Sequence, residues 1–87
     1  PEVMQITFKL YASLTDYLPP DRRRDNRMPL DVAADASITK IIEPFGLPPK
    51  LVHLVLVNGV FVPPEERATR TLVEGDVLAI WPPIAGG

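Results

Sequence analysis

The sequence predicts an α+β domain in which one main helix packs on one face of a mixed sheet of four to five strands. Three observations indicate this fold class: a strand-like alternation near the start, one stretch with helical spacing, and three more strand-like segments in the second half. The length of 87 residues allows a single domain with one modest core. We expect the domain to span residues 1–81 and residues 82–87 to form an extended tail.

The first predicted strand begins at Val3 and alternates between apolar and polar residues from Met4 onward. The face that we expect to be buried carries Met4, Ile6, Phe8 and Leu10. Residues 16–26 hold two adjacent prolines and a run of four charged residues, which predicts a solvated loop. A second strand is expected near residues 27–32, so the first two strands form a hairpin with a long loop.

Helical spacing occurs between Ser37 and Gly46. Ser37 is suited to cap the N-terminus of a helix, because its hydroxyl can accept a hydrogen bond from a backbone N–H of the first turn. The apolar positions of this helix follow the spacing i, i+3, i+4, i+7 and are Ile38, Ile41, Ile42 and Phe45. Pro44 disfavours a helical Glu43, and Gly46 suits a left-handed turn, so the helix should have about two turns.

The second half predicts three strands. Residues 51–57 are apolar on both faces, which is typical of a central strand covered on each side. The Asn-Gly pair at 58–59 is a strong hairpin signal and leads into a short strand at 60–62, which the prolines at 63–64 end. A Glu-Gly-Asp turn then precedes the last strand, residues 77–81.

Strand parity predicts an aromatic patch on the outer face of the sheet. If Leu78 and Ile80 point inward, then Trp81 points outward, and the same rule puts Tyr11 on the outer face. Aromatic side chains at a surface are suited to anchor a protein partner. Leu54 and Leu56 are expected to extend this patch. The simpler alternative is that the rings cover the edge of the core.

Composition excludes several function classes. The net charge of -2 provides no field for nucleic acid or an anionic membrane, so we expect neither partner. The chain has no cysteine, hence no thiolate nucleophile or cysteine-ligated metal. No apolar run is long enough to cross a membrane and the N-terminus lacks the features of a signal peptide, so a cytoplasmic location is expected. His53 has no acid near it in sequence, and Glu65 and Glu66 have no further ligands, so neither a catalytic base nor a metal site is predicted.

The arginines of the first loop are a weaker candidate for binding. Arg22, Arg23, Arg24 and Arg27 could contact phosphate or RNA. Three aspartates at positions 16, 21 and 25 neutralise the segment, and no aromatic stacking platform accompanies it. A solvated loop, or one that steers a partner, is the interpretation that the composition favours.

The order of the predicted elements resembles that of the ubiquitin-like β-grasp fold. The ending, residues 79–87, resembles the C-terminus of the MoaD/ThiS sulfur carriers and is most similar to MoaD-type proteins, the small subunits of molybdopterin synthase. Residues 57–59 and 72–76 also match a strand-end turn and a leucine followed by a Gly-Asp turn in that family. Residues 11–20, with the arginines that follow, instead resemble a divergent branch of ubiquitin-like domains that are sometimes fused to ribonuclease-like domains.

The resemblance implies a sulfur carrier rather than an enzyme: a carrier protein or small non-catalytic subunit of a sulfur-transfer complex. An E1-like adenylating enzyme would activate the carboxylate of Gly87, a sulfur donor would convert it to a thiocarboxylate, and Gly86 would serve as spacer. The acceptor would be an enzyme such as the molybdopterin synthase large subunit in molybdenum cofactor biosynthesis. The chain itself would bind no cofactor or metal, because the ATP binds to the activating partner.

The resemblance also implies which residues meet the partners. They are Tyr11, Phe61 and Trp81. We also expect the residues that lead to the terminus, Pro82, Pro83, Ile84 and Ala85, to contact the partners. The residue types of the tail suit this role, because two glycines without Cβ atoms can enter a narrow channel and two prolines favour an extended chain that leaves the sheet edge.

Three alternatives stay open at this point. The carrier could serve thiamine thiazole formation, tRNA thiolation or cysteine synthesis instead. The same activated terminus could be joined to a lysine, as in a ubiquitin-like protein modifier. Finally, the domain could be an interaction or RNA-binding module in which the two glycines are idle.

Overall fold

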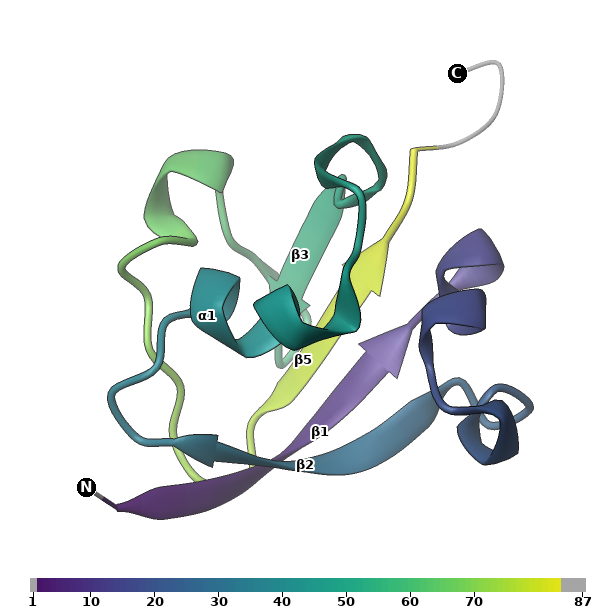
Figure 1. Ribbon diagram of the computed structural model, residues 1–87. Coiled ribbons are helices and arrows are strands. Elements are labelled where there is room, and N and C mark those ends of the chain that lie inside the picture. The colour runs from purple at the N-terminus through teal and green to yellow at the C-terminus, as the bar shows by residue number, and fades with distance from the viewer. Residues whose placement is uncertain (1, 84–87) are drawn as a thin grey trace.

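The computed structural model describes residues 2–83, and within them one α-helix packs on one face of a five-stranded mixed sheet (Figure 1). The elements are β1 (Val3–Leu10), β2 (Arg27–Ala33), α1 (Ile38–Ile42), β3 (Leu54–Val57), β4 (Val60–Phe61) and β5 (Val77–Trp81). The strand order in the sheet is β2-β1-β5-β3-β4. The predicted fold class is confirmed. The predictions for Ile84, Ala85, Gly86 and Gly87 lie outside the described residues.

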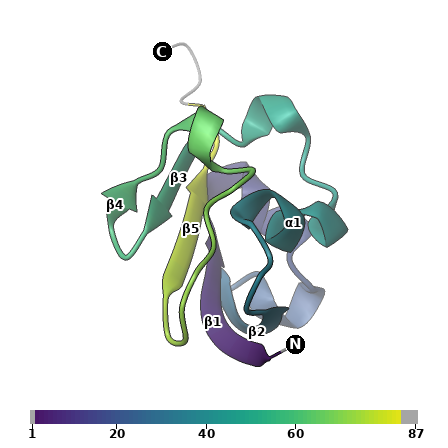
Figure 2. The same cartoon turned by 90° about the vertical axis from the view of Figure 1, so that its left-hand side faces the viewer.

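The central pair of the sheet is formed by the first and last strands. β1 pairs with β5 in parallel and with β2 in antiparallel orientation, and β3 joins the other side of β5. The four residues predicted for the inner face of β1, Met4, Ile6, Phe8 and Leu10, are all buried. The ring of Phe8 contacts Phe45 at a centroid distance of 4.5 Å, so the segment after α1 covers the middle of the sheet (Figure 2).

The helix begins as the sequence predicts. Ser37 Oγ accepts a hydrogen bond from the backbone N–H of Lys40 at 3.2 Å, which caps α1. The segment ends at Gly46, whose φ of 68° is in the left-handed region that favours glycine. Since α1 has only five residues, packing against the sheet rather than helix propensity stabilises it.

The expectation that Pro44 keeps Glu43 out of a helical conformation is wrong. Glu43 has φ -52° and ψ -46°, and α1 continues directly into the 3-10 helix Glu43–Phe45. Pro44 is tolerated there because it lies in the first turn of that 3-10 helix, where a missing N–H leaves no internal hydrogen bond unmade.

The third strand is shorter and less covered than predicted. β3 begins at Leu54, because Pro49–Leu51 forms a 3-10 helix that starts at a proline. The strand is buried on one face only: Val55 and Val57 face the core, whereas the side of the strand that carries Leu54 is open and Leu54 is 39% exposed. A sheet with a helix on one side leaves its other face open, and the apolar residues on that open face therefore need another explanation.

The predicted loop between β1 and β2 does more than connect strands. It contains the 3-10 helices Ala12–Tyr17 and Pro20–Arg22, and Leu14 and Leu18 on it are fully buried. Arg23 fixes the loop from within, because its guanidinium donates to the carbonyls of Leu18 at 3.0 Å and Asp16 at 2.9 Å. The segment therefore closes one end of the core. No helix among residues 2–83 is long and apolar enough to cross a membrane.

Candidate functional site

The end of β5 is held on both sides up to the residue before Pro82. The carbonyl of Ile80 accepts a hydrogen bond from Tyr11 N–H, and that of Trp81 accepts one from His53 N–H, both at 3.1 Å. Pro82 and Pro83 have no N–H and cannot extend this pairing. Figure 1 shows the chain leaving the sheet just beyond the arrowhead of β5. The point at which the chain leaves the domain is thus fixed by backbone bonds from two neighbouring segments.

Two aromatic rings stack beside this exit. The centroids of Tyr11 and Trp81 are 3.8 Å apart and their planes differ by 5°. The stack follows from the register, because the parallel pairing of Leu10 with Ile80 places the next residues of the two chains side by side. Trp81 is 37% exposed, so the stack presents aromatic surface to solvent.

An apolar surface extends from this stack across β3 to β4. Strand pairing puts Leu54 beside Trp81, and Leu56 between Ala79 and Phe61. Phe61 is 48% exposed. We call this surface the apolar outer face; its members are Tyr11, Leu54, Leu56, Phe61, Ala79 and Trp81. Contiguous exposed apolar side chains on a sheet are typical of a surface that binds another protein.

A row of basic residues borders the apolar outer face. Lys9 pairs with Ala79 on one side and with Arg27 on the other, so both cations lie on the same face of the sheet. The positive charge of Lys9 and Arg27 is complementary to an acidic surface. It would favour a partner that carries carboxylates next to an apolar patch.

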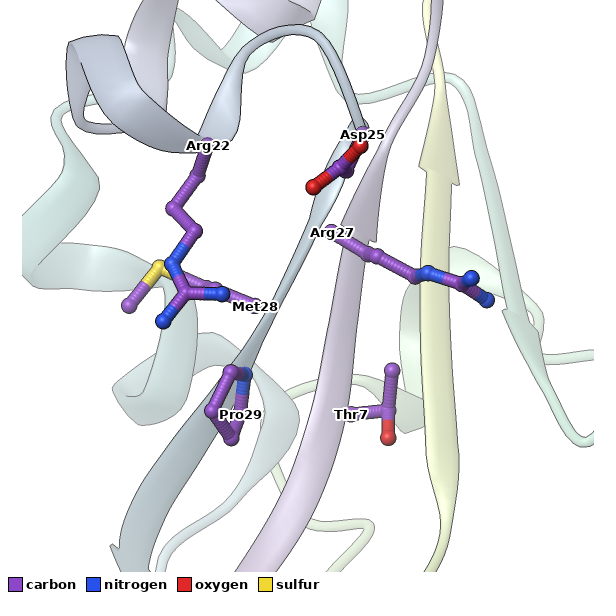
Figure 3. Close-up of a pocket in the computed structure, with 6 residues that line it drawn as sticks. All are labelled: Thr7, Arg22, Asp25, Arg27, Met28 and Pro29. Atoms are coloured by element: carbon purple, nitrogen blue, oxygen red, sulfur yellow. The ribbon is translucent and has the colours of Figure 1, made fainter.

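Next to this row, a shallow pocket of about 400 Å³ lies between the first loop and the sheet. It is lined by Thr7, Arg22, Asp25, Arg27, Met28 and Pro29 (Figure 3). The side chains of Arg22 and Arg27 point in different directions in Figure 3, and Asp25 lies beside Arg27. Two guanidinium groups that do not converge form a poor cradle for a phosphate.

Arg67 is a buried cation that the sequence did not single out. It is 8% exposed, and its guanidinium donates to the carbonyls of Val62 at 3.1 Å, His53 at 3.1 Å and Val52 at 3.4 Å. Burial lowers the pKa of Arg67, while the nearby carboxylate of Glu65 acts in the opposite direction. These bonds tie the start of β3 to the end of β4 and so hold the backbone that supports Phe61 and Trp81.

A second missed feature joins the two turns at the opposite end of the sheet. Asn58 Nδ2 donates to Asp76 Oδ1, and Val77 N–H donates to Asn58 Oδ1, both at 2.8 Å. The other oxygen of Asp76 accepts from Val73 N–H at 2.9 Å. Both turns were predicted and both are confirmed, with positive φ at Asn58, Gly59 and Gly75. The hydrogen bonds between the two turns could not be predicted from the local sequence of either turn.

A family model described as Mut7-C ubiquitin matches residues 3–85 of the sequence. The chain belongs to this family. The resemblance to ubiquitin-like β-grasp proteins is thereby confirmed. Among curated proteins, none is similar enough in sequence to count as a match.

Solved structures similar to this Mut7-C ubiquitin share its fold. The HVO 2177 protein of Haloferax volcanii has 21% identity and a TM-score of 0.74, over 98% of this chain and 88% of that one. SAMP1 of the same organism has 22% identity and a TM-score of 0.64, over 95% and 99%. Small archaeal modifier protein 1 of Methanosarcina acetivorans has 17% identity and a TM-score of 0.63, over the whole of both chains.

The structure of this Mut7-C ubiquitin brings some of the predicted site residues together. Tyr11 and Trp81 stack at the chain exit, Pro82 and Pro83 follow at once, and Phe61 lies two strands from Trp81 across Leu56 and Ala79. His53 is exposed, and residues 2–83 contain no group of three or more histidine and acidic side chains placed to hold a metal. The described arrangement is an apolar, partly aromatic surface beside the point at which the chain leaves the sheet.

Proposed function

We propose that this Mut7-C ubiquitin is a sulfur carrier whose Gly87 carboxylate is activated by an adenylating enzyme and then holds sulfur as a thiocarboxylate. One observation carries the proposal: after β5 the chain leaves the sheet at the border of the apolar outer face. A partner bound to Tyr11 and Trp81 therefore lies next to the chain that leads to Gly86 and Gly87. Binding energy from the domain can then position a terminus that has no side chains of its own.

The chemistry requires that geometry because a carboxylate is a poor electrophile. The Gly87 carboxylate attacks the α-phosphate of ATP in the active site of the partner, which forms an acyl-adenylate and releases pyrophosphate. A sulfide equivalent from the donor then attacks the acyl carbon, a C–S bond forms and AMP leaves. Gly86 and Gly87 have no Cβ atoms, so the reacting end can enter a narrow channel. The proposal requires that Gly87 bears the free carboxylate of the chain in the cell.

The apolar outer face supplies the grip. Exposed aromatic side chains dominate the binding energy of many protein interfaces, and Trp81 and Phe61 are the exposed aromatic residues of this face. The basic residues Lys9 and Arg27 border it and would orient an acidic partner surface. We propose the adenylating enzyme and the sulfur acceptor as two successive partners of this face. The acceptor that best fits the resemblance of residues 79–87 is a molybdopterin synthase large subunit.

A second candidate function is protein modification. SAMP1 of Haloferax volcanii and small archaeal modifier protein 1 of Methanosarcina acetivorans, both similar in fold, are modifiers by name. A modifier uses the same acyl-adenylate, but a lysine amine rather than sulfide attacks the acyl carbon. The two functions therefore share the activation step and differ in the product.

The test is mass spectrometry of the full chain after incubation with an E1-like adenylating enzyme, ATP and sulfide. A carrier shows the mass increase expected when one oxygen is replaced by sulfur, and a chain without Gly86 and Gly87 shows none. A modifier instead forms an isopeptide to a lysine of a second protein. The carrier proposal is wrong if neither acyl-adenylate nor thiocarboxylate forms, or if the native protein continues beyond Gly87. If partner binding survives removal of both glycines while no acyl product forms, the domain is an interaction module.

A further inference from the structure

The sheet has one long open edge within residues 2–83. In the order β2-β1-β5-β3-β4, each of the two outer strands has a single neighbour. β4 has two residues and is followed by Pro63, whereas β2 has seven residues and runs along the border of the sheet (Figure 1). An edge strand of this length presents unpaired backbone groups to which another chain can bind.

The direction of the backbone groups of β2 can be read from its register. Leu10 N–H donates to the Asn26 carbonyl at 3.1 Å just before β2, and Ala34 N–H donates to the Glu2 carbonyl at 2.9 Å just after it. Antiparallel pairs alternate between hydrogen-bonded and non-hydrogen-bonded positions. The even-numbered residues of β2 therefore bond to β1, and the odd-numbered residues direct their N–H and C=O groups to the open edge.

Pro29 agrees with this assignment. It has an odd number, so its missing N–H removes no bond to β1. The carbonyl of Ala33 accepts from Ala36 N–H at 3.0 Å. The Pro29 carbonyl, both backbone groups of Asp31 and the N–H of Ala33 have no hydrogen-bond partner in the described part of the chain. These four groups could form a short ladder with an added strand.

An apolar pocket lies along the same edge. It has a volume of about 260 Å³ and is situated between β2 and the α1 segment. The lining residues are Leu30, Asp31, Val32, Ala33, Ala36, Lys40, Ile41, Pro44 and Phe45. Since α1 is only five residues long, it leaves Leu30 and Phe45 half-buried rather than buried. The groove therefore offers apolar contact directly beside unpaired backbone groups.

We propose that the open edge of β2 binds an extended segment of a partner protein by strand addition. Side chains two residues apart on the added strand would enter the groove next to Leu30 and Val32, and the residue between them would lie beside Asp31 on the other face. Lys40 is the one cation lining the groove in the described residues and suits a carboxylate at its rim. The fitting segment has apolar residues at i and i+2, a hydroxyl or basic residue between them, and an acidic residue next to the pair.

A second copy of this chain fits the edge less well. Two β2 strands paired about Asp31 would place two carboxylates directly opposite each other, which destabilises a sheet. Pro29 on each strand would also remove a donor from the joint ladder. Charge and sequence therefore favour a different chain as the occupant.

The experiment selects linear peptides from a displayed random library on the full chain and measures the affinity of the enriched peptides. Asp31→Pro removes the one central donor of the open edge without touching a backbone bond to β1. Asp31→Ala is its matched control, because both variants lose the hydrogen bond from Gln5 Nε2 to Asp31 Oδ1 at 3.5 Å. We expect Asp31→Pro to weaken binding by roughly tenfold and Asp31→Ala by less than about threefold. Lys40→Glu should weaken the binding of acidic peptides by about fivefold, whereas Lys50→Glu, which lies outside the groove, should leave their affinity unchanged.

Amide hydrogen exchange gives a second readout that does not depend on the variants. Bound peptide should slow exchange at Asp31 and Ala33. The proposal is wrong if no peptide is enriched, if enriched peptides bind Asp31→Pro as well as the parent chain, or if Trp81→Ala abolishes their binding. It is also wrong if the edge pairs two copies, seen as self-association that Asp31→Pro removes. Binding needs neither ATP nor Gly86 and Gly87, so the result is independent of the carrier function.

Discussion

Tyr11 and Trp81 stack with ring centroids 3.8 Å apart, and this pair joins the ends of β1 and β5 at the place where the chain leaves the sheet. The two rings are 70 residues apart in sequence, yet the parallel register of two neighbouring strands makes their contact unavoidable. Because the same rings face solvent, one contact contributes to both the stability of the domain and the surface next to its exit.

Two substitutions of Tyr11 distinguish the contribution of its ring to stability from that of its hydroxyl. Tyr11→Ala removes the stack and should lower the free energy of unfolding by about 1 kcal/mol, which is the usual contribution of an aromatic pair. Tyr11→Phe keeps the ring and should stay within about 0.5 kcal/mol of the parent chain. Urea denaturation measures both values. Equal losses in the two variants would show that the hydroxyl, and not the stack, is what stabilises this region.

Trp81→Ala tests the apolar outer face as the grip for the activating enzyme. We expect kcat/KM for acyl-adenylate formation to fall by roughly 10- to 100-fold, because a partly exposed tryptophan is the residue type most often found as a hot spot of an interface. Phe61→Ala should give a smaller loss. Val73→Ala is the matched control, since Val73 is 66% exposed near the turn at Gly75, far from the exit. A normal rate for Trp81→Ala would place the docking surface elsewhere.

The hydrogen bonds between the two turns predict a large effect of Asp76→Ala. Asp76 is 7% exposed, and its loss leaves Asn58 Nδ2 and Val73 N–H without their acceptors. We expect a loss of about 2 to 3 kcal/mol in the free energy of unfolding. Glu74→Ala, in the same turn, removes only an exposed hydrogen bond, from Gln5 N–H to Glu74 Oε1 at 3.0 Å, and should cost less than about 1 kcal/mol. Thermal denaturation of the two variants compares them, and similar midpoints would contradict the role given to Asp76.

Local signals predicted the order and type of the main strands and of the helix, and distant contacts explain much of what these signals missed. The alternation from Met4, the cap at Ser37 and the Asn-Gly turn each depend on neighbouring residues, and each is confirmed. Leu18 was assigned to a solvated loop because residues 16–26 hold two adjacent prolines and a run of charges, and Leu14, just before that range, was assigned to no element. Their burial depends on the open end of the core, which is formed by strands far away in the sequence.

The residues of the candidate site also fall into two groups, those that a local sequence pattern predicted and those that only the fold brings together. Parity was sufficient to predict that Trp81 and Tyr11 share the outer face, since it needs only the direction of alternate side chains. The same rule put Leu54 and Leu56 on this face, although the apolar run 51–57 also suggested a strand covered on both sides, which the 39% exposure of Leu54 contradicts. Arg67 lies in a polar loop that resembles any other surface segment, and only the fold brings it to the carbonyls of Val52 and His53.

Arg67→Met removes the buried guanidinium while keeping an apolar side chain of similar length. Three carbonyls lose their donor, so we expect a loss of about 2 to 3 kcal/mol in the free energy of unfolding. Arg70→Met, three residues on and exposed, is the matched control and should stay within about 0.5 kcal/mol.

The pH dependence of the Arg67→Met difference follows from the sign of the pKa shift. Burial lowers the pKa of Arg67 in the folded state, so folding disfavours the charged form, and this cost is relieved only as the pH rises through the folded pKa. An arginine loses its proton far above neutrality even when its pKa is lowered. The difference between Arg67→Met and the parent chain should therefore stay constant between about pH 6 and 8. A difference that changes across this range would contradict the assignment of the lost stability to the hydrogen bonds of the charged guanidinium.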